Sequence, residues 1–249
     1  MKKTSLFFLA IFASVLVFGQ NKDVIYINGQ PFDSTDVLHS IVHEFDILNE
    51  NYKNQDQIVL VYQWRDQSNP LVAGIEKKKG KWKLAIGPVR ASIGRSGFAE
   101  MDEKWEGDGK TPSGFYKLGQ LYSYDSVVNT KLPYIRVNEQ DKWIDDTGSI
   151  DYNKYIRGET TAKSFEHLLL KSIDYKYCMV IEYNTNPIVP GKGSAIFFHV
   201  ATDTYKPTSG CVAIAQKDME KFLSWLKPKK QKSMMIKGLI KGLFFDIKK

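Results

Sequence analysis

The sequence predicts a mainly β fold with a few helices, that is, a β-rich α+β domain. Short runs rich in Val, Ile, Tyr and Phe recur along the chain and are punctuated by Gly, Asn and Pro, as in sheets joined by tight turns. Three stretches instead place apolar residues at helical spacing. The 249 residues are 43% hydrophobic and 25% charged, values that are ordinary for a folded globular protein.

The first 19 residues have the pattern of a secretory signal peptide. Lys2 and Lys3 supply a positive start, residues 6–18 are almost wholly apolar, and Val17 and Gly19 are small enough to precede a signal-peptidase cleavage site. A membrane anchor is the alternative, but the apolar run is short for a bilayer. We therefore expect the mature chain to be exported.

The mature chain divides into three parts with no Gly/Ser-rich linker between them. Residues 20–55 form an N-terminal helical extension, residues 56–228 form one β-rich domain, and residues 229–249 form a basic C-terminal tail. This tail either stays separate or completes the domain. Ser233 to Ile236 fits a strand that closes a sheet, whereas the apolar residues from Met235 to Phe244 fit a helical stripe.

The excess of positive charge is confined to the C-terminal end. The formal net charge is +7, with two of the 35 basic residues in the signal peptide and eight in residues 227–249, which hold one of the 28 acidic residues. The remaining chain carries 25 basic and 27 acidic residues. No nucleic-acid-binding face is therefore expected. The Lys-rich tail either contacts an anionic surface of wall polymer or lipid, or is a solvated end that aids solubility.

The N-terminal extension begins with an exposed lead-in, Val24 to Phe32, which has a turn at Asn28-Gly29, and continues into a predicted helix around Asp33 to Asn49. His39 and His43 lie one turn apart on this helix, a spacing that suits a metal ion. However, there is no glutamate-flanked zinc signature and no third ligand nearby. We expect ordinary histidines here and no metal site.

The central domain contains most of the predicted strands. Residues 71–77 and 81–86 are expected to form a hairpin that turns at Lys79-Gly80. A helix at 216–226 has an apolar stripe and ends at Pro228. The stripe consists of Met219, Phe222, Leu223 and Leu226. The other predicted segments are strands at 58–64, 89–94, 115–124, 134–137, 177–183, 194–200 and 212–215, and a short helix at 164–172.

The chain has two cysteines, Cys178 and Cys211. In an exported protein, a disulfide between them is one interpretation. The alternative is one buried thiol and one reactive thiol, and the local sequences favour it. Cys178 lies inside the apolar run Tyr177 to Ile181, which is typical of a core residue. We therefore predict free thiols, with Cys178 in the core.

Cys211 lies in a segment that has the parts of a thiol nucleophile. His199 closes an apolar strand, a mostly polar loop follows, and Gly210 immediately precedes Cys211. A thiol attacks only as the thiolate and therefore needs a base beside it. The loop is long enough to bring Cys211 alongside His199, and the amides around Gly210 and Cys211 suit an oxyanion. Taken singly, a core cysteine and a capped histidine explain the same residues.

The turn Thr208-Ser209-Gly210-Cys211 after His199 resembles the signature of the L,D-transpeptidase (YkuD-type) catalytic domain family, in the branch with a P-T-[AS]-G-C-V-A turn. Other segments that resemble this family are Gly107 to Gly114 (G-D-G-K-T-P-S-G), Trp143 to Asp146, Tyr152-Asn153, Pro187 to Ala195 and Pro207 to Ile214. The resemblance covers most of residues 56–228. It implies an L,D-transpeptidase-like catalytic domain there, built as a β-sandwich or mixed sheet.

The resemblance also implies acyl transfer on peptidoglycan stem peptides. Cys211 would attack a tetrapeptide stem, release its terminal D-alanine and hold the rest as a thioester, with His199 as the base. Thr208, Ser209 and Gly210 would form the oxyanion and substrate turn. An amine from a second stem would give a 3–3 crosslink, whereas water would make the site an L,D-carboxypeptidase or a related amidase. With the signal peptide pattern, the resemblance implies a protein that is secreted across the inner membrane and is periplasmic or associated with the cell wall. No metal and no organic cofactor are implied. A catalytically silent module that binds peptidoglycan is a third interpretation.

Two positions depart from the common signature of this family. Ser209 stands where the family usually has a histidine, and Ala213 stands where it usually has an arginine suited to a substrate carboxylate. These departures leave the choice between crosslinking and trimming open.

Five other side chains keep two interpretations each. Asp108 acts on substrate or orders a turn, and Asp145 and Asp146 order a loop or cap a helix. Trp105 and Trp143 line a substrate groove or pack in the core.

Overall fold

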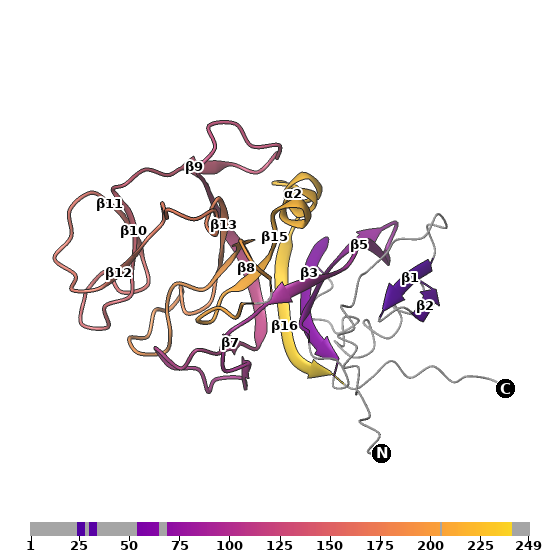
Figure 1. Cartoon of the computed structure of the whole chain (residues 1–249), viewed down its shortest axis with the longest axis horizontal. Coiled ribbons are helices and arrows are strands. Elements are labelled where there is room, and N and C mark those ends of the chain that lie inside the picture. The colour runs from indigo at the N-terminus through magenta and orange to yellow at the C-terminus, as the bar shows by residue number, and fades with distance from the viewer. Residues whose placement is uncertain (1–23, 28–29, 34–53, 65–68, 205, 241–249) are drawn as a thin grey trace, which may run out of the picture.

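The computed structural model describes residues 24–27, 30–33, 54–64, 69–204 and 206–240 (Figure 1). Strands dominate, and α2 is the one helix among these residues, so the predicted β-rich class is confirmed. The elements are β1 (Val24–Ile27), β2 (Gln30–Asp33), β3 (Gln57–Trp64), β4 (Leu71–Lys78), β5 (Lys81–Ser92), β6 (Phe98–Ala99), β7 (Thr111–Pro112), β8 (Gly114–Ser123), β9 (Tyr134–Arg136), β10 (Asp141–Ile144), β11 (Tyr155–Arg157), β12 (Phe165–His167), β13 (Tyr177–Ile181), β14 (Phe197–Ala201), β15 (Val212–Ala215), α2 (Gln216–Trp225) and β16 (Lys232–Ile240).

Nine strands form one mixed sheet in the order β13-β14-β15-β5-β4-β3-β16-β8-β9. A further antiparallel pairing joins β13 to β8, with Cys178 opposite Tyr122. The pairings from β13 round to β8 therefore form a closed ring, and β9 extends from β8. The pairs β14–β15 and β16–β3 are parallel. Closure of this kind removes exposed strand edges.

Helix α2 packs on β14, β15 and β5. Its predicted stripe of Met219, Phe222, Leu223 and Leu226 is at most 1% exposed. Phe222 meets Phe198 of β14 edge-on, with ring centroids 5.6 Å apart. Because burial of each such side chain contributes roughly 1.5–3 kcal/mol, this packing fixes β14 and β15 firmly against the rest of the domain.

The β4–β5 hairpin turns where the sequence predicts. Lys79 and Gly80 connect the two strands with φ angles of 51° and 77°. A two-residue hairpin turn requires such left-handed values at both positions. Strand β5 continues to Ser92, so the segments predicted at 81–86 and 89–94 form a single strand with irregular pairing near its middle.

Strand β16 occupies the place predicted for a C-terminal tail. It lies between β3, to which it is parallel, and β8, to which it is antiparallel. Met234, Met235 and Ile236 are at most 4% exposed. Residues 232–240 therefore form a strand that completes the domain. Burial of its apolar side chains and pairing on both sides outweigh the helical spacing.

The helix predicted at 164–172 is wrong. Phe165–His167 forms β12, which pairs with β10 so that Glu166 lies opposite Trp143. Strands β10, β11 and β12 form a small separate sheet at the left end of Figure 1. The apolar spacing of so short a stretch is weak evidence for a helix, and pairing with a strand about twenty residues away overrides it.

Several predictions lie outside the described residues: the signal peptide at 1–19, the helix after Asp33 with its pair His39 and His43, and residues 241–249. In the N-terminal extension the described residues form the two-stranded sheet of β1 and β2, in which Val24 lies opposite Asp33. In the described part of the chain, no helix has the length and apolar character to span a membrane.

Candidate active site

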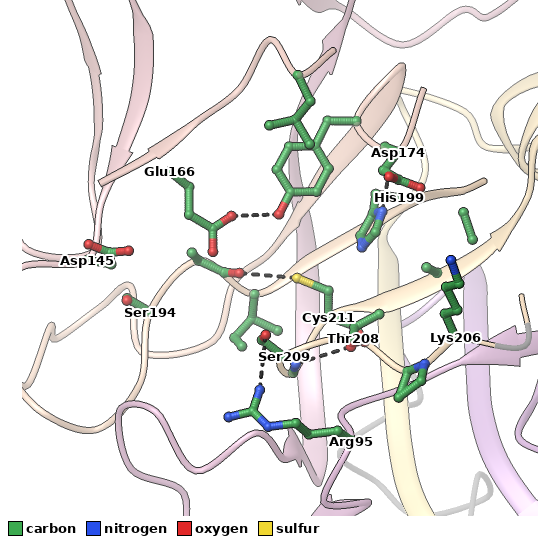
Figure 2. Close-up of a pocket in the computed structure, with 18 of the residues that line it drawn as sticks. Arg95, Asp145, Glu166, Asp174, Ser194, His199, Lys206, Thr208, Ser209 and Cys211 are labelled. Atoms are coloured by element: carbon green, nitrogen blue, oxygen red, sulfur yellow. Dashed lines mark hydrogen bonds between the residues drawn. The ribbon is translucent and has the colours of Figure 1, made fainter. Parts of the chain in front are cut away.

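Cys211 and His199 lie on neighbouring parallel strands and face the same side of the sheet. Phe198 is opposite Val212 and His199 is opposite Ala213 in the β14–β15 pair. Cys211, which precedes Val212, is therefore level with Phe197, two positions from His199. Alternate residues of a strand point to the same face, so both side chains project into the same cavity (Figure 2). They are 7% and 6% exposed.

The turn before Cys211 is held by hydrogen bonds on both sides. The Thr208 hydroxyl donates to the Cys211 carbonyl at 2.7 Å and accepts from the Gly210 N–H at 3.1 Å. The Thr208 N–H donates to the Ile93 carbonyl at 2.8 Å. Gly210 has a φ of 148°, and a Cβ there would lie 2.9 Å from the Lys110 carbonyl oxygen, so glycine is required. The Gly210 amide, predicted for an oxyanion, is directed at Thr208 in this state.

The thiol of Cys211 forms hydrogen bonds with two backbone groups. Its Sγ donates to the Ala195 carbonyl at 3.3 Å and accepts from the Phe197 N–H at 3.4 Å. Burial raises the pKa of Cys211 to about 12, and the negative charge of Glu166 adds to the rise. The Phe197 N–H, the Lys104 ammonium and the Tyr175 hydroxyl each lower the pKa. The thiol is therefore neutral near pH 7.

The imidazole of His199 is oriented by two carbonyl groups. Its Nδ1 lies 2.9 Å from the Asp174 carbonyl oxygen and 2.7 Å from the Val200 carbonyl oxygen. A nitrogen between two acceptors must carry the proton, which leaves Nε2 as the lone pair that accepts a proton. Burial lowers the pKa of His199, although both hydrogen bonds oppose the shift. The ring of Tyr175 lies edge-on to the imidazole, with centroids 4.9 Å apart.

These environments set a neutral acid next to a neutral base. A high pKa for the thiol of Cys211 and a low pKa for His199 both favour the uncharged pair over the thiolate–imidazolium pair. Proton transfer is therefore uphill in the resting site. It is expected to accompany attack on a carbonyl carbon, when the sulfur charge passes into the new bond.

The cavity has a volume of about 690 Å³ and is charged on opposite sides. Figure 2 shows Asp145 and Glu166 on one side, Arg95 and Lys206 on other sides, and Cys211 among them. Such a volume is typical of a site for a small molecule or a peptide segment. The charged side chains that line the cavity are Arg95, Lys104, Glu106, Asp145, Glu166, Asp174, Asp203 and Lys206. His199, which with Cys211 forms the candidate dyad, adds a positive charge when it is protonated.

Residues 66–234 match the L,D-transpeptidase catalytic domain family (YkuD). The chain belongs to this family. The match covers the residues that line the cavity, Cys211 and His199 included, and every strand of the ring except β3 and most of β16. Comparison of the chain with curated proteins and with solved structures gave no match.

In this L,D-transpeptidase domain, Asp108 orders the G-D-G-K-T-P segment. Its carboxylate accepts from the Trp105 N–H at 3.1 Å, from the Lys110 N–H at 2.8 Å and from the Lys104 ammonium at 2.7 Å. These donors hold the pKa of Asp108 below its ordinary value against the opposing effect of burial. The turn interpretation of Asp108 therefore fits its contacts.

The other residues with two interpretations also have clear surroundings. Trp143 is buried, and its indole N–H donates to Asn153 Oδ1 at 2.8 Å, which fits core packing. Trp105 is 56% exposed and lies under the Lys110 ammonium. Asp146 accepts from the Gly148 and Lys163 N–H groups and so orders a loop. Asp145 lines the cavity and accepts from the Ser164 hydroxyl.

The sequence interpretation missed the partners of the dyad. Arg95, Glu166, Asp174 and Tyr175 all line the cavity, yet none belongs to a recognisable catalytic pattern. Glu166 falls in the wrongly predicted helix, and the other three lie in connections between strands. The pairing of β12 with β10 places Glu166 at the cavity, and the loop that leads to β13 places Asp174 and Tyr175 there. Arg95 is placed by the hydrogen bond from its N–H to the Thr208 carbonyl. The single sequence carries no local signal for that.

Both cysteines are free thiols, as predicted. Cys178 is fully buried and lies directly opposite His199 in the β13–β14 pair. It is thus two strands away from Cys211, and two strand spacings amount to about 9.6 Å. A disulfide requires Cα atoms within about 7 Å, so this fold keeps the two thiols apart. Within the described ranges, no group of three or more His, Cys, Asp or Glu side chains is placed to hold a metal ion.

Proposed function

We propose that the protein is an exported peptidoglycan L,D-transpeptidase that acts through a thioester on Cys211. The observation that supports this most directly is the position of the Cys211 thiol beside His199, on the wall of a cavity of about 690 Å³, in a chain of the L,D-transpeptidase catalytic domain family. The family acts on peptidoglycan stem peptides. The geometry of this site supports Cys211 as the nucleophile and His199 as the base.

The first half-reaction transfers the stem to the enzyme. The Sγ of Cys211 attacks the carbonyl carbon that precedes the terminal D-alanine of a tetrapeptide stem, while Nε2 of His199 takes the thiol proton. The S–C bond forms, the C–N bond breaks, and the proton passes from His199 to the leaving amine. D-alanine departs, and the stem remains as a thioester.

The second half-reaction decides the product. An amine of another stem attacks the thioester, gives its proton to His199 and forms an amide, which is a 3–3 crosslink, and the Cys211 thiol is regenerated. Water in place of the amine gives a shortened stem and makes the same site an L,D-carboxypeptidase. The neutral His199 is a suitable base for either acceptor, because burial lowers its pKa and keeps Nε2 unprotonated near neutral pH.

Incubation of the mature protein with purified tetrapeptide muropeptides tests the proposal. We expect the intact mass of the protein to rise by the mass of the acyl group on Cys211, and dimers with 3–3 links to accumulate. Release of D-alanine without dimers would assign the carboxypeptidase instead. Failure to acylate a fully reduced Cys211 would favour a silent module that binds peptidoglycan.

The two cysteines supply a matched control. Cys211→Ala should abolish the adduct. Cys178→Ala should retain the adduct, because Cys178 is buried on β13, next to the strand of His199 and two strands away from Cys211. An adduct on Cys211→Ala protein would place the nucleophile elsewhere.

We further propose a periplasmic or wall-associated location, on the basis of the signal peptide pattern in residues 1–19. The lysines after residue 226 favour contact with anionic wall polymer or lipid. Fractionation of cells that express the full chain tests the location, and recovery of an uncleaved protein in the cytosol would contradict it.

A further inference from the structure

Arg95 places a positive charge in the cavity beside the nucleophile turn. Its Nη1 donates to the Ser209 hydroxyl oxygen at 3.1 Å, and its Nη2 donates to the Gly107 carbonyl at 3.4 Å. Figure 2 shows Ser209 between the guanidinium and Cys211. Ser209 is two residues from Cys211, so a group bound by Arg95 lies close to the reacting carbon.

The charge of Arg95 is not neutralised by the fold. Both of its acceptors are neutral, and among the residues that the structure describes Arg95 contacts no carboxylate. Lys104 lines the same cavity but differs, because its ammonium lies 2.7 Å from the buried Asp108 carboxylate. An exposed guanidinium with spare N–H donors is matched in charge and geometry to a ligand carboxylate.

The backbone fixes Arg95 relative to Cys211. The Arg95 N–H donates to the Thr208 carbonyl at 2.8 Å, and the preceding Gly94 N–H donates to the Thr111 hydroxyl oxygen at 2.9 Å. A Cβ at Gly94 would lie 2.3 Å from the Gly109 carbonyl oxygen, so the two segments meet in direct backbone contact. The arginine and the nucleophile turn therefore form one rigid unit, which suits the positioning of a substrate.

A glycine also makes room for the guanidinium. Gly109 has a φ of 68°, and a Cβ there would lie 2.8 Å from the Arg95 Cζ atom. The absence of a side chain at this position leaves room for the arginine beside the G-D-G-K-T-P segment, where Arg95 also lines the cavity. Arg95 therefore packs against this segment, which the hydrogen bonds of Asp108 hold in place.

We infer that Arg95 is a specificity-determining residue that binds a carboxylate of the stem peptide; this rests on the proposed function. The opposite wall, with Asp145 and Glu166, repels the same group, so the two sides together orient the substrate. A stem whose third residue is diaminopimelate has two carboxylates near the bond that breaks, that of the terminal D-alanine and that on the side chain of the diaminopimelate. Arg95 binds one of them.

Binding to an inactive protein tests this without any chemistry. In the Cys211→Ala background, calorimetry compares a synthetic tetrapeptide with two analogues, one amidated at the D-alanine carboxylate and one amidated at the diaminopimelate side chain. We expect the acid to bind roughly 10- to 100-fold more tightly than one of the analogues, as for a hydrogen bond to a charged group. Adding Arg95→Gln should make the acid and that analogue bind equally well. It should leave unchanged the ratio of the affinities for the acid and the other analogue.

Further variants separate a specific contact from a general loss of charge or fold. Arg95→Lys keeps the charge but not the two-pronged geometry and should retain only part of the preference. Ser209→Ala removes the acceptor that holds Nη1 and should weaken the preference less than Arg95→Gln does. Arg136→Gln, a change at an exposed arginine on β9, should leave the preference intact. Thermal unfolding checks that each variant is folded.

The inference would be overturned if the Arg95→Gln variant still bound the acid more tightly than each analogue by the same factor as the protein with Arg95. Equal binding of all three peptides, or no measurable binding of any of them, by the Cys211→Ala protein would also overturn it. The proposed function fails separately, if the wild-type protein binds the acid with this preference but never forms a thioester.

Discussion

The hydroxyl of Tyr175 donates a 2.5 Å hydrogen bond to the Oε2 atom of Glu166. Both residues line the cavity together with Cys211, and they alter the pKa of its thiol with opposite sign. The carboxylate of Glu166 raises this pKa, whereas the hydroxyl of Tyr175 lowers it. The reactivity of the thiol therefore depends on a balance between two neighbours as well as on His199.

Glu166→Gln should lower the pKa of Cys211, because it removes the negative charge and keeps an acceptor for Tyr175. The rate of iodoacetamide alkylation of Cys211, measured at one fixed pH of about 9, should then be higher than in the wild-type protein, because a larger fraction of the thiol is ionised. Glu139→Gln, at an exposed glutamate, should leave this rate unchanged. An unchanged rate in Glu166→Gln would show that the charge of Glu166 has no effect on the pKa of Cys211.

Tyr175→Phe should have the opposite effect on the same measurement. The ring that lies against His199 is kept, but the hydroxyl that stabilises the thiolate is lost. The rate of alkylation at the same fixed pH should therefore be lower than in the wild-type protein. The free energy of unfolding should also fall by about 1 kcal/mol, as is usual for one lost hydrogen bond. Faster alkylation in this variant would show that the hydroxyl does not lower the pKa of Cys211.

His199 makes the stability of the protein dependent on pH in a defined direction. Burial lowers its folded pKa, so the unfolded chain binds the proton more readily. Its contribution to stability is present above the unfolded pKa of about 6.5 and is lost as the pH falls from there through the folded pKa. Urea unfolding should therefore show a larger loss of stability between about pH 7 and pH 5 in the wild-type protein than in His199→Asn. Equal losses would mean that His199 is readily protonated in the fold.

Asp141 should be important for the small sheet that carries Glu166. Its carboxylate has no exposed surface and accepts from Arg157 Nε at 2.6 Å, from the Tyr155 hydroxyl at 2.6 Å and from the Asn138 N–H at 2.6 Å. Asp141→Asn should lower the free energy of unfolding by about 2–3 kcal/mol, because the buried network loses its negative charge and one of its two acceptor oxygens. Asp151→Asn breaks the ion pair with Lys154, in which the lysine side chain is 47% exposed and the aspartate side chain 39% exposed. It should lower the free energy of unfolding by less than about 1 kcal/mol. Similar losses in both variants, by urea unfolding, would argue against a special role for Asp141.

Truncation after Gln231 should prevent folding, because it removes β16 from between β3 and β8. Near-ultraviolet circular dichroism should then show no fixed tertiary packing. Lys229→Gln, an exposed change just before the strand, should leave the spectrum unaltered. A folded truncated protein would mean that β3 and β8 can close the sheet on their own.

Local patterns in the sequence predicted the local structure well. The Lys79-Gly80 turn and the stripe of Met219 and Phe222 depend on residues a few positions apart, and both are confirmed. The pairing of Cys211 with His199 was also accessible, because the two residues flank one loop between adjacent strands. In these cases the spacing along the chain contains nearly all of the information.

Long-range contacts were beyond reach of the same reasoning. The pairing of β13 with β8 that closes the ring joins residues more than fifty positions apart. Phe165–His167 became a strand because β10 lies beside it, and its own sequence fits a helix equally well. Arg95 reaches the nucleophile turn only because its N–H bonds to the Thr208 carbonyl at 2.8 Å. Such contacts depend on tertiary structure, which periodicity and residue type do not encode.

The position of β16 also has a consequence for the timing of folding. A ribosome or a secretion channel releases the chain from its N-terminus, so β3 and β8 emerge long before the strand that must lie between them. The barrel-like core cannot close until residues 232–240 have appeared, and contacts of such high sequence separation form slowly. We therefore expect the core to form in a late step, after most of the chain has been synthesised.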